Sequence, residues 1–260
     1  MREVAWRIFA AEFNRATFQY SEGGEKATNF VVTHTGARCN RLFIVGVLNQ
    51  VEKVAENSFR ASVSDPTGNF ALHVGQYQPG AAMFLSDIET PQFVSVVGKA
   101  KVGAVRPEEM NLAVEAARNR WTLNTAERTM ERVDAMKIAV EAELRGEELE
   151  RSLAEQNIDA NLSKGISLAI ENYDINETLL DEIAKMCMDA TKTLTGDENS
   201  KTVMLGLVEH LDCGKGVSRK ELLKEAKKAG LANEKAECAL DALLDEGRCY
   251  EPKVGAIKKV

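Results

Sequence analysis

Residues 58–76 read SFRASVSDPTGNFALHVGQ and contain two strand-like segments on either side of a turn. Both segments alternate apolar and polar residues, which is typical of half-buried β-strands. Between them lies Asp65-Pro66-Thr67-Gly68, whose proline and glycine have the backbone preferences of a tight hairpin turn. The stretch therefore predicts two antiparallel strands.

The alternation assigns each side chain of the hairpin to one of two faces, because successive residues on a strand point in opposite directions. One face of the hairpin is apolar. The other face is small and polar apart from one aromatic residue, and such a face can hold a ligand. We expect six apolar residues to point into a core, namely Phe59, Ala61, Val63, Phe70, Leu72 and Val74. The outward set is Arg60, Ser62, Ser64, Ala71, His73, Gly75 and Tyr77.

Further strands are predicted on both sides of this hairpin. Residues 41–54 are apolar and β-rich, and Gly46 in their middle marks a bend. A short connection at 79–83 leads to a strand at 93–102, with Lys99 and Lys101 outside, and residues 110–114 supply a fifth strand. The inner residues of the fourth strand are Val94, Val96, Ala100 and Val102. This order predicts an OB barrel, a fold that binds oligonucleotides or oligosaccharides.

Beyond the barrel the apolar period changes to that of a helix. Between residues 124 and 153 apolar positions recur at three- and four-residue steps, which predicts one long amphipathic helix whose stripe must be buried against something. The stripe consists of Ala126, Met130, Val133, the stem of Lys137, Val140 and Leu144. Residues 161–194 also read as helices, and residues 195–200 (TGDENS) as a polar hinge.

The net charge of −7 is unevenly distributed along the chain. Residues 1–121 carry +1 and residues 201–260 carry +2, whereas residues 122–200 carry −10. The two ends can therefore approach phosphate, while the middle block is an acidic helical spacer that repels it. The small excess at the N-terminal end predicts modest DNA affinity for this chain alone.

Residues 201–260 have the signals of a winged helix. An apolar helix at 202–211 is followed by helices at 219–229 and 234–246, capped by Ser218 and Asn233 and ended by Gly230 and Gly247. Residues 248–251 and 256–260 then pair as a hairpin wing. The third helix holds Asp241, Asp245 and Glu246 against only Lys235, so it is a poor neighbour for DNA phosphates.

Several ordered segments resemble archaeal replication protein A subunits related to the eukaryotic middle subunit. These are FIVGVLNQVEKV (43–54), SFRASVSDPTGNFALHVGQYQPGA (58–81), VSVVGKAKV (94–102), VRPEE (105–109) and RNRWTLNTAERTMERV (118–133). The resemblance implies a single-stranded-DNA-binding subunit of a heterotrimer that protects DNA in replication, repair and recombination. It implies that Tyr77 stacks on a base, while Val102-Gly103-Ala104 stand where the family has a second stacking aromatic.

The same resemblance implies three domains in an α+β multidomain chain. They are an OB-fold domain with an N-terminal extension at 1–121, an assembly helix and acidic helical linker at 122–200, and a winged helix at 201–260 that recruits replication and repair proteins. The expected DNA contacts are Tyr77, Arg60, Lys99, Lys101, His73, Arg41 and Arg106. The expected contacts with other OB-fold subunits are Trp121, Met130, Val133, Val140 and Leu144.

Other interpretations stay open at this point. Tyr77 could pack on the following loop, and the long helix could pack on its own barrel or form a homodimer. The chain could also be a scaffold with little DNA contact or a telomere-capping type of OB subunit.

Catalysis, cofactors and metals are not expected. The chain has no glycine-rich phosphate loop and no H-E-x-x-H, its three histidines lack ligand spacing, and its five cysteines form no C-x-x-C pair. Buried or inert thiols are expected at Cys39, Cys187, Cys213, Cys238 and Cys249. No stretch is apolar enough to span a membrane and no leader is visible, which predicts a cytoplasmic, nucleoid-associated protein.

Overall fold

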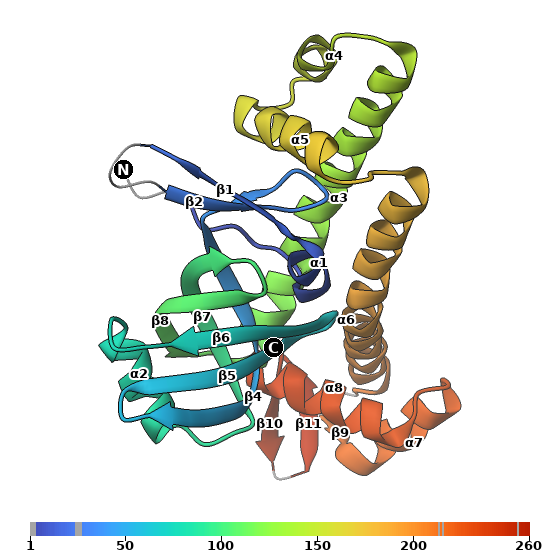
Figure 1. Cartoon of the computed structure of the whole chain (residues 1–260). Helices are drawn as coiled ribbons and strands as arrows, with labels where there is room; N and C mark the ends of the chain where they lie inside the picture. The colour runs from blue at the N-terminus through green and yellow to red at the C-terminus, as the bar shows by residue number, and fades with distance from the viewer. Residues whose placement is uncertain (1–3, 24–27, 213, 215, 254) are drawn as a thin grey trace. The chain divides into compact units, whose positions relative to one another are not determined.

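The computed structural model of the chain describes residues 4–23, 28–212, 214, 216–253 and 255–260 (Figure 1). Its contacts divide the chain into two compact units, Met1–Thr191 and Lys192–Val260. The domain boundaries predicted after residues 121 and 200 stay predictions. None of the helices in the described ranges is long and apolar enough to cross a membrane.

A closed five-stranded barrel forms the centre of the first unit. Its order is β4-β5-β6-β8-β7, with β7 pairing back onto β4 and with β6 parallel to β8. In chain order this is 1-2-3-5-4, an OB-like arrangement, so the predicted mixed α+β fold with a five-stranded barrel is confirmed. The strands are β4 (Arg41–Ala55), β5 (Ser58–Asp65), β6 (Gly68–Val74), β7 (Gln92–Lys101) and β8 (Ala104–Leu112).

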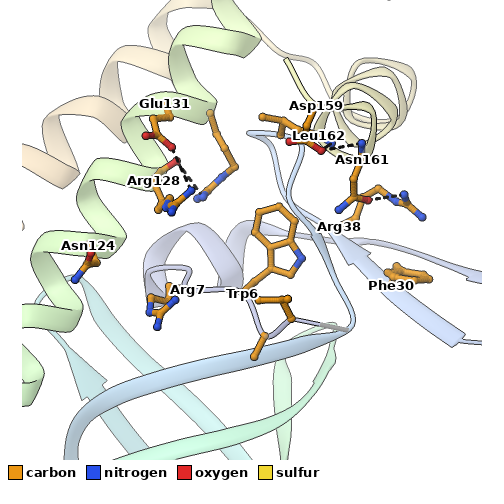
Figure 2. Close-up of a pocket in the computed structure, with 13 residues that line it drawn as sticks. Trp6, Arg7, Phe30, Arg38, Asn124, Arg128, Glu131, Asp159, Asn161 and Leu162 are labelled. Carbon is orange, nitrogen blue, oxygen red and sulfur yellow. Dashed lines mark hydrogen bonds and ion pairs between the residues drawn. The ribbon is translucent and has the colours of Figure 1, made fainter. Parts of the chain in front are cut away.

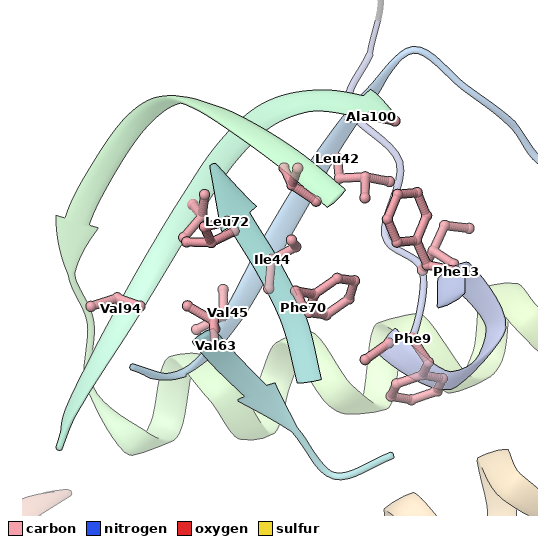
Figure 3. Close-up of a cluster of buried hydrophobic side chains, with 14 of the residues drawn as sticks. Phe9, Phe13, Leu42, Ile44, Val45, Val63, Phe70, Leu72, Val94 and Ala100 are labelled. Atoms are coloured by element: carbon pink, nitrogen blue, oxygen red, sulfur yellow. The ribbon is translucent and has the colours of Figure 1, made fainter. Parts of the chain in front are cut away.

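The barrel is filled by the alternating side chains that the sequence predicts. All six inward residues of the β5–β6 hairpin are buried (Figure 3). Gly46 allows β4 and β5 to approach closely, because a Cβ atom there would lie 2.3 Å from the carbonyl oxygen of Ser64. Phe13 packs against Phe70, with ring centroids 6.0 Å apart, and so extends the barrel core toward the N-terminal segment.

Three details of the predicted barrel are wrong. Val102 was expected inside but is 43% exposed, because β7 ends at Lys101 and Gly103, with φ at +73°, turns the chain. The fifth strand begins at Ala104 rather than at 110, and it includes Pro107 beside a register shift, where a missing backbone donor is tolerated. The connection after β6 is also longer than expected and contains helix α2 (Pro79–Asp87).

The N-terminal segment forms a helix and a small sheet. Helix α1 (Ala10–Arg15) is held at its start by Asp65 of the hairpin turn, whose carboxylate accepts the Ala10 amide at 2.7 Å. The sheet consists of β1 (Phe18–Glu22), β2 (Thr28–Val32) and β3 (Arg38–Cys39), in that order. Residues 24–27, which follow β1 in the sequence, lie outside the described residues.

Four helices follow the barrel. They are α3 (Glu115–Arg145), α4 (Leu149–Glu155), α5 (Ala160–Asn172) and α6 (Glu177–Leu211). A long helix after the barrel is confirmed, but α3 begins at Glu115 and ends at Arg145, where Gly146 has φ at +68°, so the predicted range from 124 to 153 is wrong. The predicted hinge at 195–200 is also wrong, because the backbone of α6 is helical throughout that stretch. One interior glycine costs a helix only about 1 kcal/mol, so Gly196 alone does not interrupt α6.

The second unit has its own apolar core, which includes Met204, Leu222, Leu240 and Ile257. After α6, its elements are β9 (Val217–Ser218), α7 (Arg219–Lys228), α8 (Asn233–Asp245), β10 (Cys249–Lys253) and β11 (Ala256–Lys259). The sheet order is β10-β11-β9. Cys213 and Val254, on which two expectations fall, lie outside the described residues, and the assignment as a winged helix stays a prediction.

Candidate nucleic-acid interface

Two of the expected DNA contacts face each other across the β5–β6 hairpin. Arg60 of β5 lies directly opposite His73 of β6, and both side chains are exposed. Directly paired residues in antiparallel strands have their Cβ atoms about 4.5–5.5 Å apart on the same face. Arg60 and His73 therefore share the outer surface of the barrel.

Three more of these residues continue the same row around the barrel. Lys99 of β7 lies opposite Arg106 of β8 on one side and opposite Arg41 of β4 on the other. The parallel pair Leu72 and Val105 makes His73 and Arg106 the next residues along neighbouring strands. We call the row Arg60, His73, Arg106, Lys99 and Arg41 the basic belt. It crosses all five strands of the barrel.

Tyr77 lies just beyond the end of β6, in a turn stabilised by Gln78. The Gln78 amide donates to the Gly75 carbonyl oxygen at 3.0 Å, and the Gln78 side-chain oxygen accepts the Gly75 amide at 3.0 Å. The tyrosine is 83% exposed. Its ring is therefore free of the following helix and available for stacking.

The charges of the belt differ in how far they are already neutralised. Arg41 forms an ion pair with Glu108 and its side chain is only 13% exposed, so its charge is largely partnered. No ion pair within the described part of the chain involves Arg60, Lys99, Lys101 or Arg106. Glu52 lies opposite Arg60 in register and reduces the positive potential at that end. Lys101, at the end of β7, is half-buried.

The residues expected to contact other subunits are mostly covered within this chain. Trp121 is 2% exposed, and its indole nitrogen donates to the Phe43 carbonyl oxygen at 2.7 Å. Val133 is buried, and Met130 and Val140 are partly buried against the chain's own cores. Leu144, by contrast, is 82% exposed. The stripe of α3 thus packs on its own unit, and Leu144 alone of the five offers a largely free surface.

Metal and thiol chemistry find no support in the described residues. They contain no group of three or more histidine, cysteine or acidic side chains that could hold a metal ion. Cys39, Cys187 and Cys249 are buried free thiols, and Cys238 is an exposed one. Burial raises the pKa of Cys187 to about 12, which keeps that thiol protonated and unreactive.

One cation near the belt was missed by the sequence analysis. The guanidinium of Arg7 lies 5.1 Å from the centre of the Phe43 ring, beside Arg41 on the outer surface of β4. Trp6 brings it there through a parallel bridge to Leu42. Because that pairing joins residues far apart in the chain, no local pattern could have indicated it.

Comparisons with known proteins report remote likeness to solved structures. No protein family and no curated protein matches the sequence. Among solved structures, a chain of a replication protein A heterotrimer bound to ssDNA is 15% identical, with a TM-score of 0.38, over 50% of this chain and 98% of that one. Asparaginyl-tRNA synthetases from Pyrococcus horikoshii and Entamoeba histolytica are 12% and 8% identical, with TM-scores of 0.25. Those two matches cover 41% and 37% of this chain and 31% and 30% of theirs.

Proposed function

We propose that this chain binds single-stranded DNA across the outer surface of its barrel, with Tyr77 stacking on a base. The observation that carries this proposal is the basic belt, in which the unpaired cations Lys99 and Arg106 lie side by side on neighbouring strands. Cations that follow a phosphate backbone release counterions, and an exposed aromatic ring stacks on any base. OB barrels bind either oligonucleotides or oligosaccharides, and the belt favours the phosphate-bearing ligand.

The salt dependence of binding tests this proposal. Labelled oligo-dT is titrated with the full chain at several salt concentrations, and the anisotropy of the label is measured. The four unpaired cations of the barrel, Arg60, Lys99, Lys101 and Arg106, predict a contribution of up to about −2.8 to the slope of log Kobs against log salt. Absence of binding at low salt would favour a scaffold function instead.

We further propose that the chain is one subunit of a heteromeric replication protein A-like complex acting on DNA in the cytoplasm. The sequence segments quoted above support this role, and the small charge excess fits a subunit that works beside stronger binders. Contact with another OB subunit would use the exposed end of α3 at Leu144. Sedimentation of the chain mixed with a candidate subunit, in wild type and Leu144→Asp, tests this contact.

We propose a protein-binding rather than DNA-binding role for the second unit, as a winged helix. Its helix α8 carries the acidic residues Asp241 and Glu237, and Lys235 is the single lysine of the helix. Asp241 forms an ion pair with Arg219 at 2.5 Å, and Glu237 is exposed. Such a helix repels phosphate. The function proposed for the surface of α8 is therefore the recruitment of replication or repair proteins.

A further inference from the structure

A second polar and aromatic site lies beside the barrel, in a cavity of about 610 Å³ (Figure 2). The N-terminal segment, α3 and the start of α5 surround it. Trp6 projects into its middle, with Arg7, Asn124 and Arg128 on one side and Arg38 and Asn161 on the other. The function proposed above uses none of these residues.

The four arginines of this cavity differ in the charge that they leave free. Arg132 is buried against Glu12 at 2.9 Å, and Arg38 pairs with Glu22 at 2.8 Å, so both are neutralised. Arg7 forms no ion pair within the described residues. Arg128 is 71% exposed and reaches Glu131 only at 3.8 Å, a weak surface contact. Arg7 and Arg128 can therefore accept an anion.

Trp6 is held in place by backbone hydrogen bonds, and its ring packs partly against the barrel core. Its amide donates to the Arg41 carbonyl oxygen and its carbonyl oxygen accepts the Phe43 amide, both at 2.8 Å. The indole is half-buried, with the Arg132 guanidinium 5.8 Å from its centre. A fixed, partly open aromatic ring next to two free cations matches the chemistry of a nucleotide, whose base stacks and whose phosphate is anionic.

The cavity continues the basic belt. The belt ends at Arg41 on β4, and the Trp6 backbone hydrogen-bonds to Arg41 and to Phe43. Arg7 lies over Phe43, two residues further along the same strand. A strand lying on the belt therefore meets Arg7 next and then the indole of Trp6.

We propose that this cavity binds one nucleotide of the single strand, with the base against Trp6 and the phosphate between Arg7 and Arg128. This inference rests on the proposed function, because the neighbouring nucleotides lie on the belt. It adds a second stacking position to Tyr77 and extends the DNA path from the barrel to α3.

Tryptophan fluorescence tests the inference in the full chain. Trp6 and Trp121 are its two tryptophans, and Trp121 is buried. Oligo-dT is titrated while label anisotropy and tryptophan emission are recorded together. We expect binding to quench the emission, and Trp6→Phe to abolish the quenching while oligo-dT still binds. Arg7→Ala with Arg128→Ala should weaken binding and make the salt slope less steep by about 1.4, the effect of two phosphate contacts.

The matched control is Arg145→Ala. Arg145 is an exposed arginine on the same helix as Arg128, and it forms an ion pair with Glu141. This substitution should change neither affinity nor slope. If oligo-dT binds in a Tyr77-dependent way but Trp6 emission stays unchanged and the arginine pair has no effect, the inference is overturned and the proposed function stands. If oligo-dT does not bind the wild type at all, both are overturned.

Discussion

Tyr77 combines high exposure with a fixed backbone, because the turn from Gly75 to Gln78 holds it just past β6. Its ring contributes little to folding and is free to contact a ligand. The opposite holds for Glu12 and Arg132, which are buried together and contribute to stability alone. These two sites show how exposure separates binding residues from structural ones.

Replacing Tyr77 with alanine should weaken oligo-dT binding by about 1–3 kcal/mol, the usual effect of losing one base-stacking ring. The melting temperature should stay unchanged because the ring packs on nothing. Anisotropy titrations and thermal unfolding measure the two effects. Tyr250→Ala, which removes an exposed tyrosine from the second unit, is the control and should leave affinity unaltered. Equal affinities for Tyr77→Ala and wild type would remove Tyr77 from the interface.

Glu12→Gln should destabilise the chain by about 3–5 kcal/mol, because it leaves the Arg132 charge buried without its counterion. Arg132 also donates to Thr35 and Thr129, both at 2.9 Å, so the cation stays in place when its partner is lost. Urea unfolding measures the change. Glu141→Gln breaks the exposed pair with Arg145 and should cost at most about 1 kcal/mol. Similar small losses for both variants would contradict this account.

At the scale of elements, α5 packs unusually closely on the loop between β2 and β3. A Cβ atom on Gly165 would lie 1.9 Å from the carbonyl oxygen of Gly36, so a glycine is required on this face of the helix. At the end of α5, Tyr173 donates to the Val32 carbonyl oxygen at 2.7 Å and stacks on His34 with ring centroids 4.0 Å apart. The helix is thus fixed to the N-terminal sheet at two points.

Gly165→Ala should lower the free energy of unfolding by about 1–3 kcal/mol or more, since overpacking forces the helix away from the loop. Gly206→Ala is the matched control, because a Cβ atom there meets no atom within 4 Å. That substitution removes a helical glycine and should be neutral or stabilise α6 by up to about 1 kcal/mol. Urea unfolding of both variants measures these changes. If Gly165→Ala leaves the free energy of unfolding unchanged, α5 is only loosely packed on the loop.

Acidification should destabilise this same contact. Burial lowers the pKa of His34, an effect that Glu12 opposes and Arg15 supports, and the His34 Nδ1 atom has no hydrogen-bond partner in the described structure. Below its unfolded pKa, about 6.5, the unfolded chain takes up a proton that the folded chain does not, so stability falls as pH falls. Unfolding at about pH 7.5 and about pH 5.5 should show a larger loss for wild type than for His34→Phe, which keeps the ring stack. An equal loss of stability in the two proteins would exclude His34 as the cause of the pH dependence.

The hairpin could be predicted from local pattern, because Phe59 to Val74 alternate with a period of two around a Pro-Thr-Gly turn, and the order of five strands then indicated the barrel. The belt could be predicted only in part. The sequence placed Lys99 and Lys101 on the outer face. Lys99 lies beside Arg106 because the chain turns at Gly103, whereas the sequence pattern predicted the fifth strand only from residue 110 and so missed this pairing. The stripe of α3 was predicted only in part, because Leu144 is 82% exposed and the buried face also contains Thr125, Thr129 and Arg132. The N-terminal sheet, which is distant in the sequence, covers part of this stripe, and the sequence pattern gave no clear indication of that sheet.

At the scale of the whole molecule, all residues of the proposed DNA path lie in one of the two compact units. The belt, Tyr77 and the Trp6 cavity all belong to Met1–Thr191, whereas Lys192–Val260 has a core of its own and an acidic α8. Shortening the chain to end at Thr191 should therefore leave its affinity for oligo-dT unchanged. Anisotropy titrations of the two lengths measure this, and a large loss would show that the second unit contacts DNA.

The central claim is that the belt binds single-stranded DNA, and reversing its charge tests that claim most directly. The variant Lys99→Glu with Arg106→Glu changes two exposed residues that lie opposite each other and form no ion pair in the described chain. Its control is Arg151→Glu with Lys185→Glu, which reverses the same charge elsewhere on the first unit. Oligo-dT titrations at low salt should show binding abolished in the first variant and nearly preserved in the second. Equal affinity of the two variants would contradict the claim.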